Sequence, residues 1–315
     1  MSAINQKTEK VLTKKTGIFT RIIRNYDLLL LMLPGFVSMI IFSYVPMYGI
    51  LLAFKDFRML DGIMGSPWVG FKYFQEMFTM PDFFNVLRNT LGISLIKLFW
   101  GFPAPIILAL MLNELRSIKF KKVVQNFTYL PYFFSWVVLG GIVRMLFSAD
   151  GPVNMFIMAM GGERLEFFAD GGLFIGLIVG TSIWQSIGWN SIIFLSAISG
   201  IDESLYEAAN IDGAGRWKQA IHITLPSLIP TIITVFILNL GGILNAGFDQ
   251  IYNLYNPVVY EAADIIDTYV FRKFEQTDYS FGTAVGLFKS VVGLILVVIT
   301  NWFVKKLTND EQGIF

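Results

Sequence analysis

The chain has no cysteine and only one histidine, His222, among its 315 residues. Without cysteine there can be no disulfide framework, cysteine-ligated zinc site or iron–sulfur cluster. One histidine excludes an H-E-x-x-H metal site, which needs two. His222 also stands alone without a plausible catalytic set around it, which nearly excludes a His-based triad. We therefore predict no catalytic residue and no metal ligand. Charged residues make up 15% of the chain, against about 25% in an ordinary soluble domain. The net charge of +1 gives no indication of a nucleic-acid partner.

Apolar residues are abundant instead, at 55% of the chain. A helix that spans a bilayer needs roughly 20 mostly apolar residues, and six runs of this kind occur. We therefore predict an all-α integral membrane protein of about six transmembrane helices, with membrane lipid around it and one membrane domain over residues 27–304. The first run is too long for the core of a signal peptide, and we expect it to be retained. The expected spans are 28–54, 91–111, 128–147, 173–198, 228–247 and 281–304.

The basic residues outside the spans predict the orientation, because cytoplasmic loops are enriched in lysine and arginine. They gather before the first span, between the second and third, and after the last, and the opposite loops are mostly acidic. Segment 1–26 and tail 305–315 are therefore expected to be cytoplasmic. The basic residues concerned are Lys7, Lys10, Lys14, Lys15, Arg21, Arg24, Arg116, Lys119, Lys121, Lys122, Lys305 and Lys306.

Three basic residues lie within or near the apolar runs, namely Lys97, Arg144 and Lys289. Ionisable groups in a bilayer usually face protein or water, so ion pairing, snorkelling and contact with an anionic sugar are all open for them. No span carries Asp or Glu near its middle, which argues against a proton- or sodium-coupled carrier. Lys289-Ser290 lacks the G-x-x-x-x-G-K-[ST] spacing of a phosphate loop, so ATP, if used, must bind another subunit.

Residues 202–226, on the expected cytoplasmic side, predict two short helices. Asp202 is a suitable N-cap, and Glu203 favours the positive end of the helix. The glycines at 213 and 215 should end this first helix. A second helix is expected over 216–221, with Pro226 in the first turn of the fifth span. Alanines on the first helix present a flat surface, and Glu207 offers a carboxylate to a basic group of a partner.

This stretch resembles the EAA signature of binding-protein-dependent ABC importer permeases, E-A-A-x3-G-x9-I-x-L-P. The resemblance implies a type I ABC importer permease fold in a bacterial cytoplasmic membrane. It further implies a coupling helix that docks on a separate ATPase, which binds the ATP and Mg²⁺, so that this chain holds no cofactor. Two such ATPase subunits, an extracytoplasmic substrate-binding protein and a second permease, expected to be a different chain, would complete the transporter. The matching residues are Glu207, Ala208, Ala209, Gly213, Ile223, Leu225 and Pro226.

Further segments resemble the carbohydrate-uptake branch: W-V-G-F at 68–71, Y-L-P at 129–131 and W-Q-S-I-G-W-N at 184–190. The run F-D-Q-I-Y-N-L-Y-N-P at 248–257 is similar to the lipoprotein-associated and alginate-type oligosaccharide permeases. An oligosaccharide importer is therefore expected. The alternatives are an ABC permease for a non-sugar solute, an ion-coupled secondary carrier and an intramembrane enzyme.

Polar and aromatic residues on one helical stripe suit a sugar, whose hydroxyls need hydrogen bonds and whose faces stack on rings. The fourth span has such a stripe at spacing i, i+3, i+4 and i+7, and the fifth could form the opposite wall. The alternative is that these residues make hydrogen bonds between helices or form interfacial belts. The candidate substrate path consists of Ser182, Gln185, Ser186, Trp189, Asn239, Gly242, Asn245 and Asp249.

Glycines recur at every fourth residue in two spans, at Gly172, Gly176 and Gly180 and at Gly282 and Gly286. Small residues at this spacing let helices approach closely. They are expected to serve packing within the chain or contact with a second permease.

Overall fold

The computed structural model describes residues 26–307, without the side chains of Phe303, Val304 and Leu307. Segment 1–26 and tail 305–315, expected to be cytoplasmic, lie almost wholly outside this range. The chain divides into two units, residues 1–51 and 52–315. Within the described residues all regular structure is helical, apart from one isolated bridge between Lys55 and Trp68.

The first unit is a single apolar helix. It begins as α2 (Tyr26–Met39), continues as a π-helical segment (Ile40–Tyr44) and passes into 3-10 turns (Val45–Phe54). Proline has no N–H to donate and crowds the preceding turn, and the helix leaves α geometry around Pro46, whereas it keeps α geometry past Pro34. The span Tyr26–Phe54 is nevertheless long and apolar enough to cross a membrane, as predicted for 28–54.

The second unit contributes five more spans, so the predicted number of six is confirmed within the described residues. They are Pro81–Asn113, Trp136–Ala159, Gly171–Ser199, Arg216–Gly241 and Tyr279–Trp302. Their helices are α5 (Pro81–Gly101), α6 (Pro103–Asn113), α8 (Trp136–Phe147), α9 (Pro152–Ala159), α10 (Gly171–Ser199), α12 (Arg216–Gln219), η4 (Ala220–Thr224), α13 (Leu225–Gly241) and α17 (Tyr279–Leu307).

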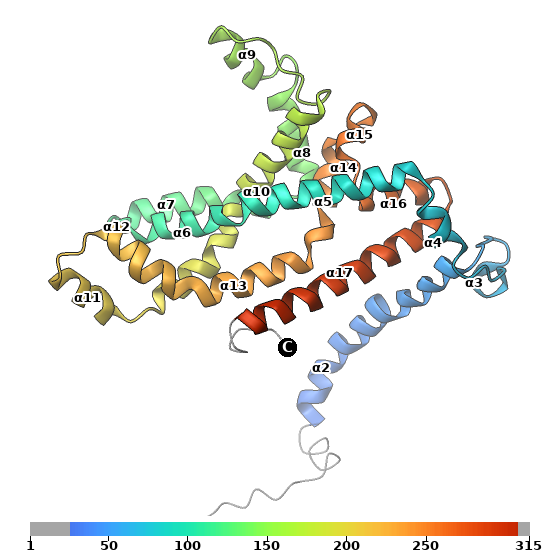
Figure 1. Ribbon diagram of the computed structural model, residues 1–315, viewed down its shortest axis with the longest axis horizontal. Coiled ribbons are helices and arrows are strands. Elements are labelled where there is room, and N and C mark those ends of the chain that lie inside the picture. The colour runs from blue at the N-terminus through green and yellow to red at the C-terminus, as the bar shows by residue number, and fades with distance from the viewer. Residues whose placement is uncertain (1–25, 308–315) are drawn as a thin grey trace, which may run out of the picture. The chain divides into compact units, whose positions relative to one another are not determined.

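Shorter helices connect these spans. They are α3 (Gly62–Gly65), α4 (Lys72–Met77), α7 (Ile118–Tyr129), η3 (Leu130–Phe133), α11 (Glu203–Ile211), η5 (Ile243–Asn245), α14 (Phe248–Leu254), η6 (Pro257–Val259), α15 (Tyr260–Ala263) and α16 (Ile266–Glu275). Figure 1 shows α11 and α12 at one end of this unit and α9 projecting from its side.

Three predicted spans have wrong boundaries. The second was expected over 91–111, but its helix already begins at Pro81. The third was expected over 128–147, but α7 ends before Pro131 and the apolar helix begins only at Trp136. The fifth was expected over 228–247, but the helix runs from Arg216 to Gly241. It ends at Gly241 and is followed by the 3-10 turn Ile243–Asn245 and then by a reversal at Ala246 and Gly247, which have φ of 43° and 90°. Such positive φ values are incompatible with a continuing helix, and apolar composition alone gave no sign of them.

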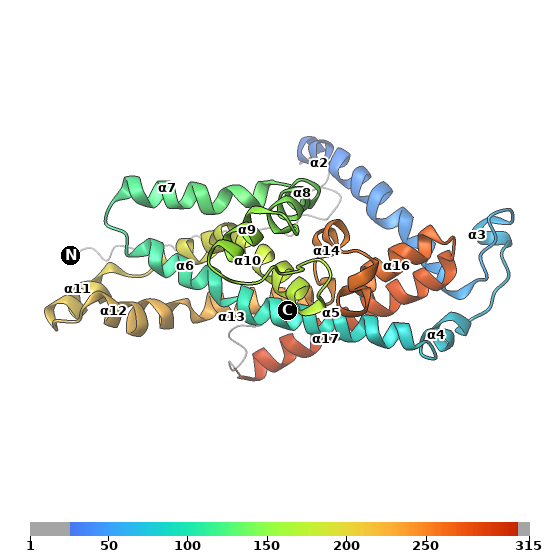
Figure 2. The same cartoon turned by 90° about the horizontal axis from the view of Figure 1, so that it is seen from above.

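Helix α10 is the centre of the second unit and packs against α5, α6, α7 and α13 (Figures 1 and 2). Gly188 allows its contact with α7, because a Cβ there would overlap the Thr128 carbonyl and lie 2.9 Å from the Tyr129 ring. Gly140 of α8 similarly lies against Asn253 of α14. The contact at Gly188 fixes which face of α10 is turned to α7.

Three buried clusters hold the helices of this unit together. One surrounds Phe174 and Ile178 on the first half of α10, and another surrounds Phe194 on its second half. The third lies where α4 and α5 meet α16 and α17, around Phe83 and Phe281. The chain therefore has a continuous packed framework from α4 to the region of α6, along which the polar features below are placed.

Candidate functional site

Helix α11 is the first part of the predicted coupling loop and is capped at both ends. At its start the Asp202 carboxylate accepts a hydrogen bond from the Ser204 N–H at 3.0 Å. This bond lowers the pKa of Asp202, because it stabilises the charged form. The helix over Glu203–Ile211 thus begins where the sequence predicted.

The C-terminal cap of α11 explains the spacing between the alanines and the glycine of the EAA signature. Gly213 N–H donates to the Asn210 carbonyl at 3.1 Å, and Ala214 N–H donates to the Ala209 carbonyl at 2.8 Å. This pair of bonds is a Schellman motif, which needs a left-handed residue just past the helix. Gly213 supplies it with φ of 74°. Ala209 and Gly213 must therefore be four residues apart for the turn to close.

The second part of the loop is not a separate short helix as predicted. Helix α12 continues through the π-helical segment Ala220–Thr224 into α13 without a break. Pro226 lies in the first turn of α13, as predicted, although the continuous span already begins at Arg216. Since proline cannot complete the hydrogen bond of an α-helix, the irregular turn that precedes it is consistent with its position.

Side-chain hydrogen bonds hold the two parts of the loop in place. The Gln219 amide donates to the Asn210 side chain at 2.7 Å and to the Ala214 carbonyl at 2.9 Å. The Arg216 guanidinium donates to the Glu114 carbonyl at the end of α6, at 3.1 Å. The turn is therefore braced from inside and attached to the membrane helices.

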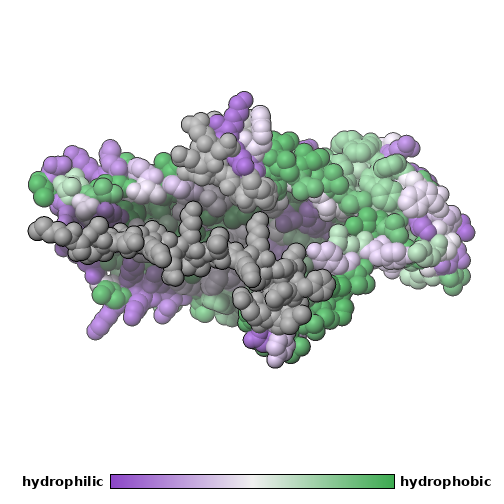
Figure 3. Space-filling view, turned by 90° about the horizontal axis from the view of Figure 1, so that it is seen from below, coloured by the Kyte–Doolittle hydropathy of each residue, from purple (hydrophilic) through white to green (hydrophobic). Residues whose placement is uncertain are grey.

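The outer surface of the loop is free of such bonds. Glu207 and Ala208 are exposed, and no hydrogen bond or ion pair of Glu207 occurs within the described residues. Ile211 is 87% exposed and Trp217 78% exposed. The end of the unit that carries α11 and α12 is otherwise mostly hydrophilic on the face in Figure 3. Two large apolar side chains next to a small one and a free carboxylate form a surface that is suited to a protein partner.

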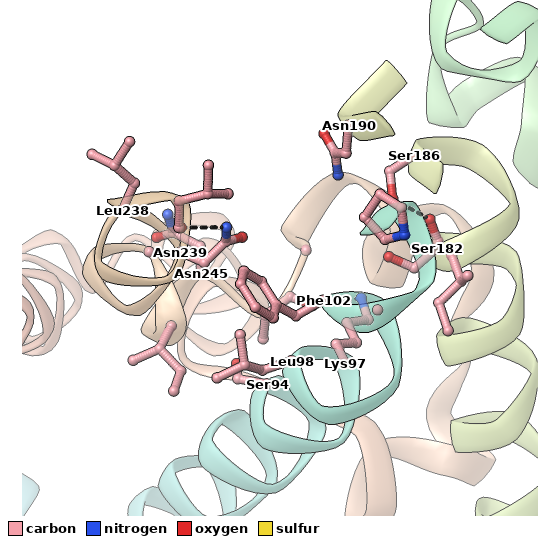
Figure 4. Close-up of a pocket in the computed structure, with 18 of the residues that line it drawn as sticks. Ser94, Lys97, Leu98, Phe102, Ser182, Ser186, Asn190, Leu238, Asn239 and Asn245 are labelled. Carbon is pink, nitrogen blue, oxygen red and sulfur yellow. Dashed lines mark hydrogen bonds between the residues drawn. The ribbon is translucent and has the colours of Figure 1, made fainter. Parts of the chain in front are cut away.

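A cavity of about 440 Å³ lies between α5, α10 and the end of α13. Helix α5 contributes Ser94 and Lys97, and α10 contributes Ser182, Ser186 and Asn190, whereas Asn239 and Asn245 lie on the opposite wall (Figure 4). Neutral amides and hydroxyls therefore face one space from three elements. Such a lining can hydrogen-bond a ligand rich in hydroxyl groups.

Five residues of the predicted substrate path line this cavity: Ser182, Ser186, Asn239, Gly242 and Asn245. The other three do not. Gln185 and Asp249 line a separate hollow beside α8, and Asp249 belongs to α14 rather than to the fifth span. Trp189 stacks on Tyr132, with ring centroids 4.7 Å apart and planes within 5°. The predicted stripe of α10 is thus divided between two sides of the helix, because α7 and η3 pack along it.

Three polar lining residues were missing from the predicted path, namely Ser94, Lys97 and Asn190. Lys97 was recognised as a charge in a span, but its place in the cavity was not. Its Nζ donates to the Ala246 carbonyl at 2.7 Å and to Gln250 Oε1 at 2.6 Å. Only the reversal after α13 brings these acceptors near α5, and that reversal was not predicted.

The other two intramembrane cations have partners in the chain. Lys289 forms an ion pair with Asp267 of α16, with both oxygens at 2.7 Å from Nζ. Arg144 donates to the carbonyls of Asn253 and Tyr255, at 3.1 and 3.3 Å. An ion pair was among the open alternatives for Lys289, and it is the one observed.

A polar cluster attaches α15 and α16 to the start of α5. The Asn89 amide donates to the carbonyls of Glu261 and Asp264. The Asp264 carboxylate also accepts from both nitrogens at the end of the Arg272 side chain. Burial alone would lower the pKa of Arg272, but the hydrogen bonds and charge of Asp264 outweigh it and raise that pKa. This arrangement fixes the helix that carries Ser94 and Lys97.

Known proteins resemble the chain over nearly its whole length. It is 46% identical over 97% of its length to Protein LplB of Bacillus subtilis (strain 168), covering 96% of that protein. It is 43% identical over 96% of its length to the polygalacturonan/rhamnogalacturonan transport system permease protein YteP of the same organism, covering 94% of it.

A solved structure has the same fold. It belongs to a bacterial ABC transporter involved in the import of the acidic polysaccharide alginate. The TM-score is 0.85 at 38% identity, with 92% of this chain and 99% of that chain covered. The expected type I ABC importer permease fold is therefore confirmed. Because a family model matches residues 101–309, the chain belongs to the binding-protein-dependent transport system inner membrane components.

Proposed function

We propose that this chain forms half of the membrane pathway of an ABC importer for acidic oligosaccharides. The observation that carries the proposal is the polar cavity between α5, α10 and α13, which lies along the span that continues directly from the coupling loop. ATP hydrolysis would reside in a partner, and this chain would be a non-catalytic subunit without a cofactor of its own.

The coupling role rests on the loop surface. A capped and braced α11 presents Ala208, Ile211 and the free Glu207 carboxylate outward, which suits insertion into a groove of an ATPase subunit. Trp217 extends this surface onto α12. We propose that each of two ATPase subunits binds one such loop, and that Glu207 meets a basic group there.

A second permease is proposed to complete the pathway, and we expect it to be a different chain. Two open glycines support this contact. A Cβ added to Gly176 or Gly180 would meet nothing within 4 Å among the described residues, so packing within the chain does not explain them. Both line an apolar groove between α8 and α10. Glycine on an open helix face permits close approach of another helix.

The substrate class is inferred from the cavity and from the relatives. Amides and hydroxyls that line the cavity match the hydroxyl groups of a sugar. YteP is named for polygalacturonan and rhamnogalacturonan, and the solved transporter for the acidic polysaccharide alginate. Both names describe acidic sugars, so we propose an oligosaccharide that contains uronate units, delivered by an extracytoplasmic binding protein. A non-sugar solute has no comparable support.

Affinity purification of the tagged chain from detergent-solubilised membranes tests the assembly. We expect a second permease and an ATPase to co-purify, with ATPase activity that rises when a loaded binding protein is added. Proteoliposomes with this complex should then accumulate trigalacturonate in the presence of ATP. A chain that purifies alone and transports under an ion gradient would refute the proposal in favour of a secondary carrier.

A further inference from the structure

The Lys97 amino group, a cation when protonated, lies in the wall of the cavity without a carboxylate partner among the described residues. Its two acceptors, the Ala246 carbonyl and Gln250 Oε1, are both neutral. An ammonium group has three N–H donors, so one donor remains beyond these two bonds. A lysine at depth in a membrane span usually faces protein or an aqueous cavity, and Lys97 lines the cavity. The residues that line it include no Asp or Glu.

Ser94 provides an independent sign of a missing ligand. It lies one helical turn before Lys97 on α5 and lines the same cavity. The side chain is only 6% exposed, and its hydroxyl has no hydrogen-bond partner among the described residues. Buried hydroxyl groups nearly always have a partner in native proteins. The donor of Ser94 and the third donor of Lys97 are therefore available on one helix face.

The position of the lysine is set by a chain of hydrogen bonds. The Gln250 amide donates to the Ile178 carbonyl at 2.7 Å and to Thr181 Oγ1 at 2.8 Å. Both donors of Gln250 are thereby used on α10, so its oxygen must point to Lys97. A cation held in this way loses little conformational entropy when an anion binds.

We propose that Lys97 and Ser94 form a subsite that binds the carboxylate of a uronate unit as the oligosaccharide passes through the cavity. This inference rests on the proposed transport of acidic oligosaccharides. Charge-assisted hydrogen bonds from an ammonium to a carboxylate are about twice as strong as neutral ones. The amides of Asn190, Asn239 and Asn245 then face the hydroxyls of the same or the next sugar. The subsite thus selects a substrate by its charge, whereas the remaining wall of the cavity selects it by the arrangement of its hydroxyl groups.

The test compares two probes in proteoliposomes that contain the complete importer. The rates of uptake of trigalacturonate and of its methyl ester are measured at a saturating concentration of binding protein. For each variant, the ratio of the uptake rate of the acid to that of the ester is divided by the same ratio for the wild type. The preference of the binding protein cancels, because it is the same in every preparation. The variants are Lys97→Gln, Lys97→Arg and Ser94→Ala, with Lys122→Gln and Ser199→Ala as matched substitutions outside the cavity.

We expect the ratio to fall at least about tenfold for Lys97→Gln, because a carboxylate then loses a desolvated charged partner. It should fall about threefold for Ser94→Ala, which removes one hydrogen bond to the ligand. Lys97→Arg should keep most of the ratio, and the substitutions outside the cavity should leave it unchanged.

If Lys97 only holds the turn at Ala246, Lys97→Gln will lower uptake of both probes equally and Ser94→Ala will have no effect. That result overturns the subsite. Ser94 has no hydrogen-bond partner within residues 26–307, so its replacement remains informative even if Lys97→Gln fails to fold. Wild-type uptake of trigalacturonate with unchanged ratios in the variants refutes the subsite alone. Failure of the wild type to take up either probe refutes the acidic-substrate function and the subsite with it.

Discussion

Replacing Gly213 with alanine should weaken the association between this chain and its ATPase. Gly213 has φ of 74°, and a Cβ there would meet nothing within 4 Å. The cost is therefore conformational and not steric, at about 1–2 kcal/mol for a left-handed residue with a side chain. Helix α11 has only nine residues and is exposed, so it can relieve this strain by fraying its last turn. Docking must then restore the turn.

The expected result is an apparent Kd about 5- to 30-fold higher, which is the same free energy expressed as binding. It can be measured by titrating labelled ATPase onto the purified permease complex in detergent. Gly215→Ala is a matched control, because Gly215 also has open space around it but an extended backbone, with φ of −68°. Gly213→Asn should lie between the two, since asparagine tolerates the left-handed region. Wild-type affinity for Gly213→Ala, or equal losses at both glycines, would refute the argument.

Three further outcomes are expected. In the affinity purification proposed above, Glu207→Lys should reduce the amount of ATPase that co-purifies with the chain, and Glu207→Gln should reduce it less. Normal recovery of the ATPase and normal uptake in these variants would count against the docking surface. Gly188→Ala should lower the unfolding free energy by about 1–3 kcal/mol because a Cβ there overlaps backbone of α7, and Gly176→Ala should not; melting in detergent distinguishes them. Asp267→Asn should destabilise the folded protein more than the double replacement of Asp267→Asn with Lys289→Gln, because the single change leaves a partly buried cation unpaired. If the effects of the two single replacements on thermal unfolding simply add up in the double variant, the pair is not coupled.

The number of spans, the helical fold and the bounds of α11 could be predicted because each depends on local chemistry. Apolar runs of sufficient length indicate spans, and Asp202 and Gly213 mark the two ends of α11 by capping rules. The family resemblance rested on the same loop. None of these inferences needed to know how one helix is rotated against another.

The cavity lining depends on helix rotation, and there the prediction was only partly right. Serines and asparagines of α10 and α13 reached the cavity, but Gln185 and Trp189 were turned to the side of α7 and α8. The rotation is set by contacts such as Gly188 on Thr128, which a single helical stripe does not reveal. Ser94 was missed because one serine in an apolar helix resembles background until its missing partner is seen.

The continuity of α12, η4 and α13 connects the two parts of the proposed site. The span over Arg216–Gly241 begins at the turn after α11 and ends beside Gly242 and Asn245, which line the cavity. A helix of 26 residues is about 39 Å long, so this span reaches from the coupling loop to the cavity. Movement of the coupling loop would thus move one wall of the cavity relative to Lys97 on α5. Lys97 holds the Ala246 carbonyl just beyond that wall, so the cation that we assign to substrate binding is also the contact between the fixed and the driven side. A carboxylate bound to the third donor of Lys97 would leave this contact in place, so the bound substrate would lie at the junction between α5 and the helix that we expect the ATPase to drive.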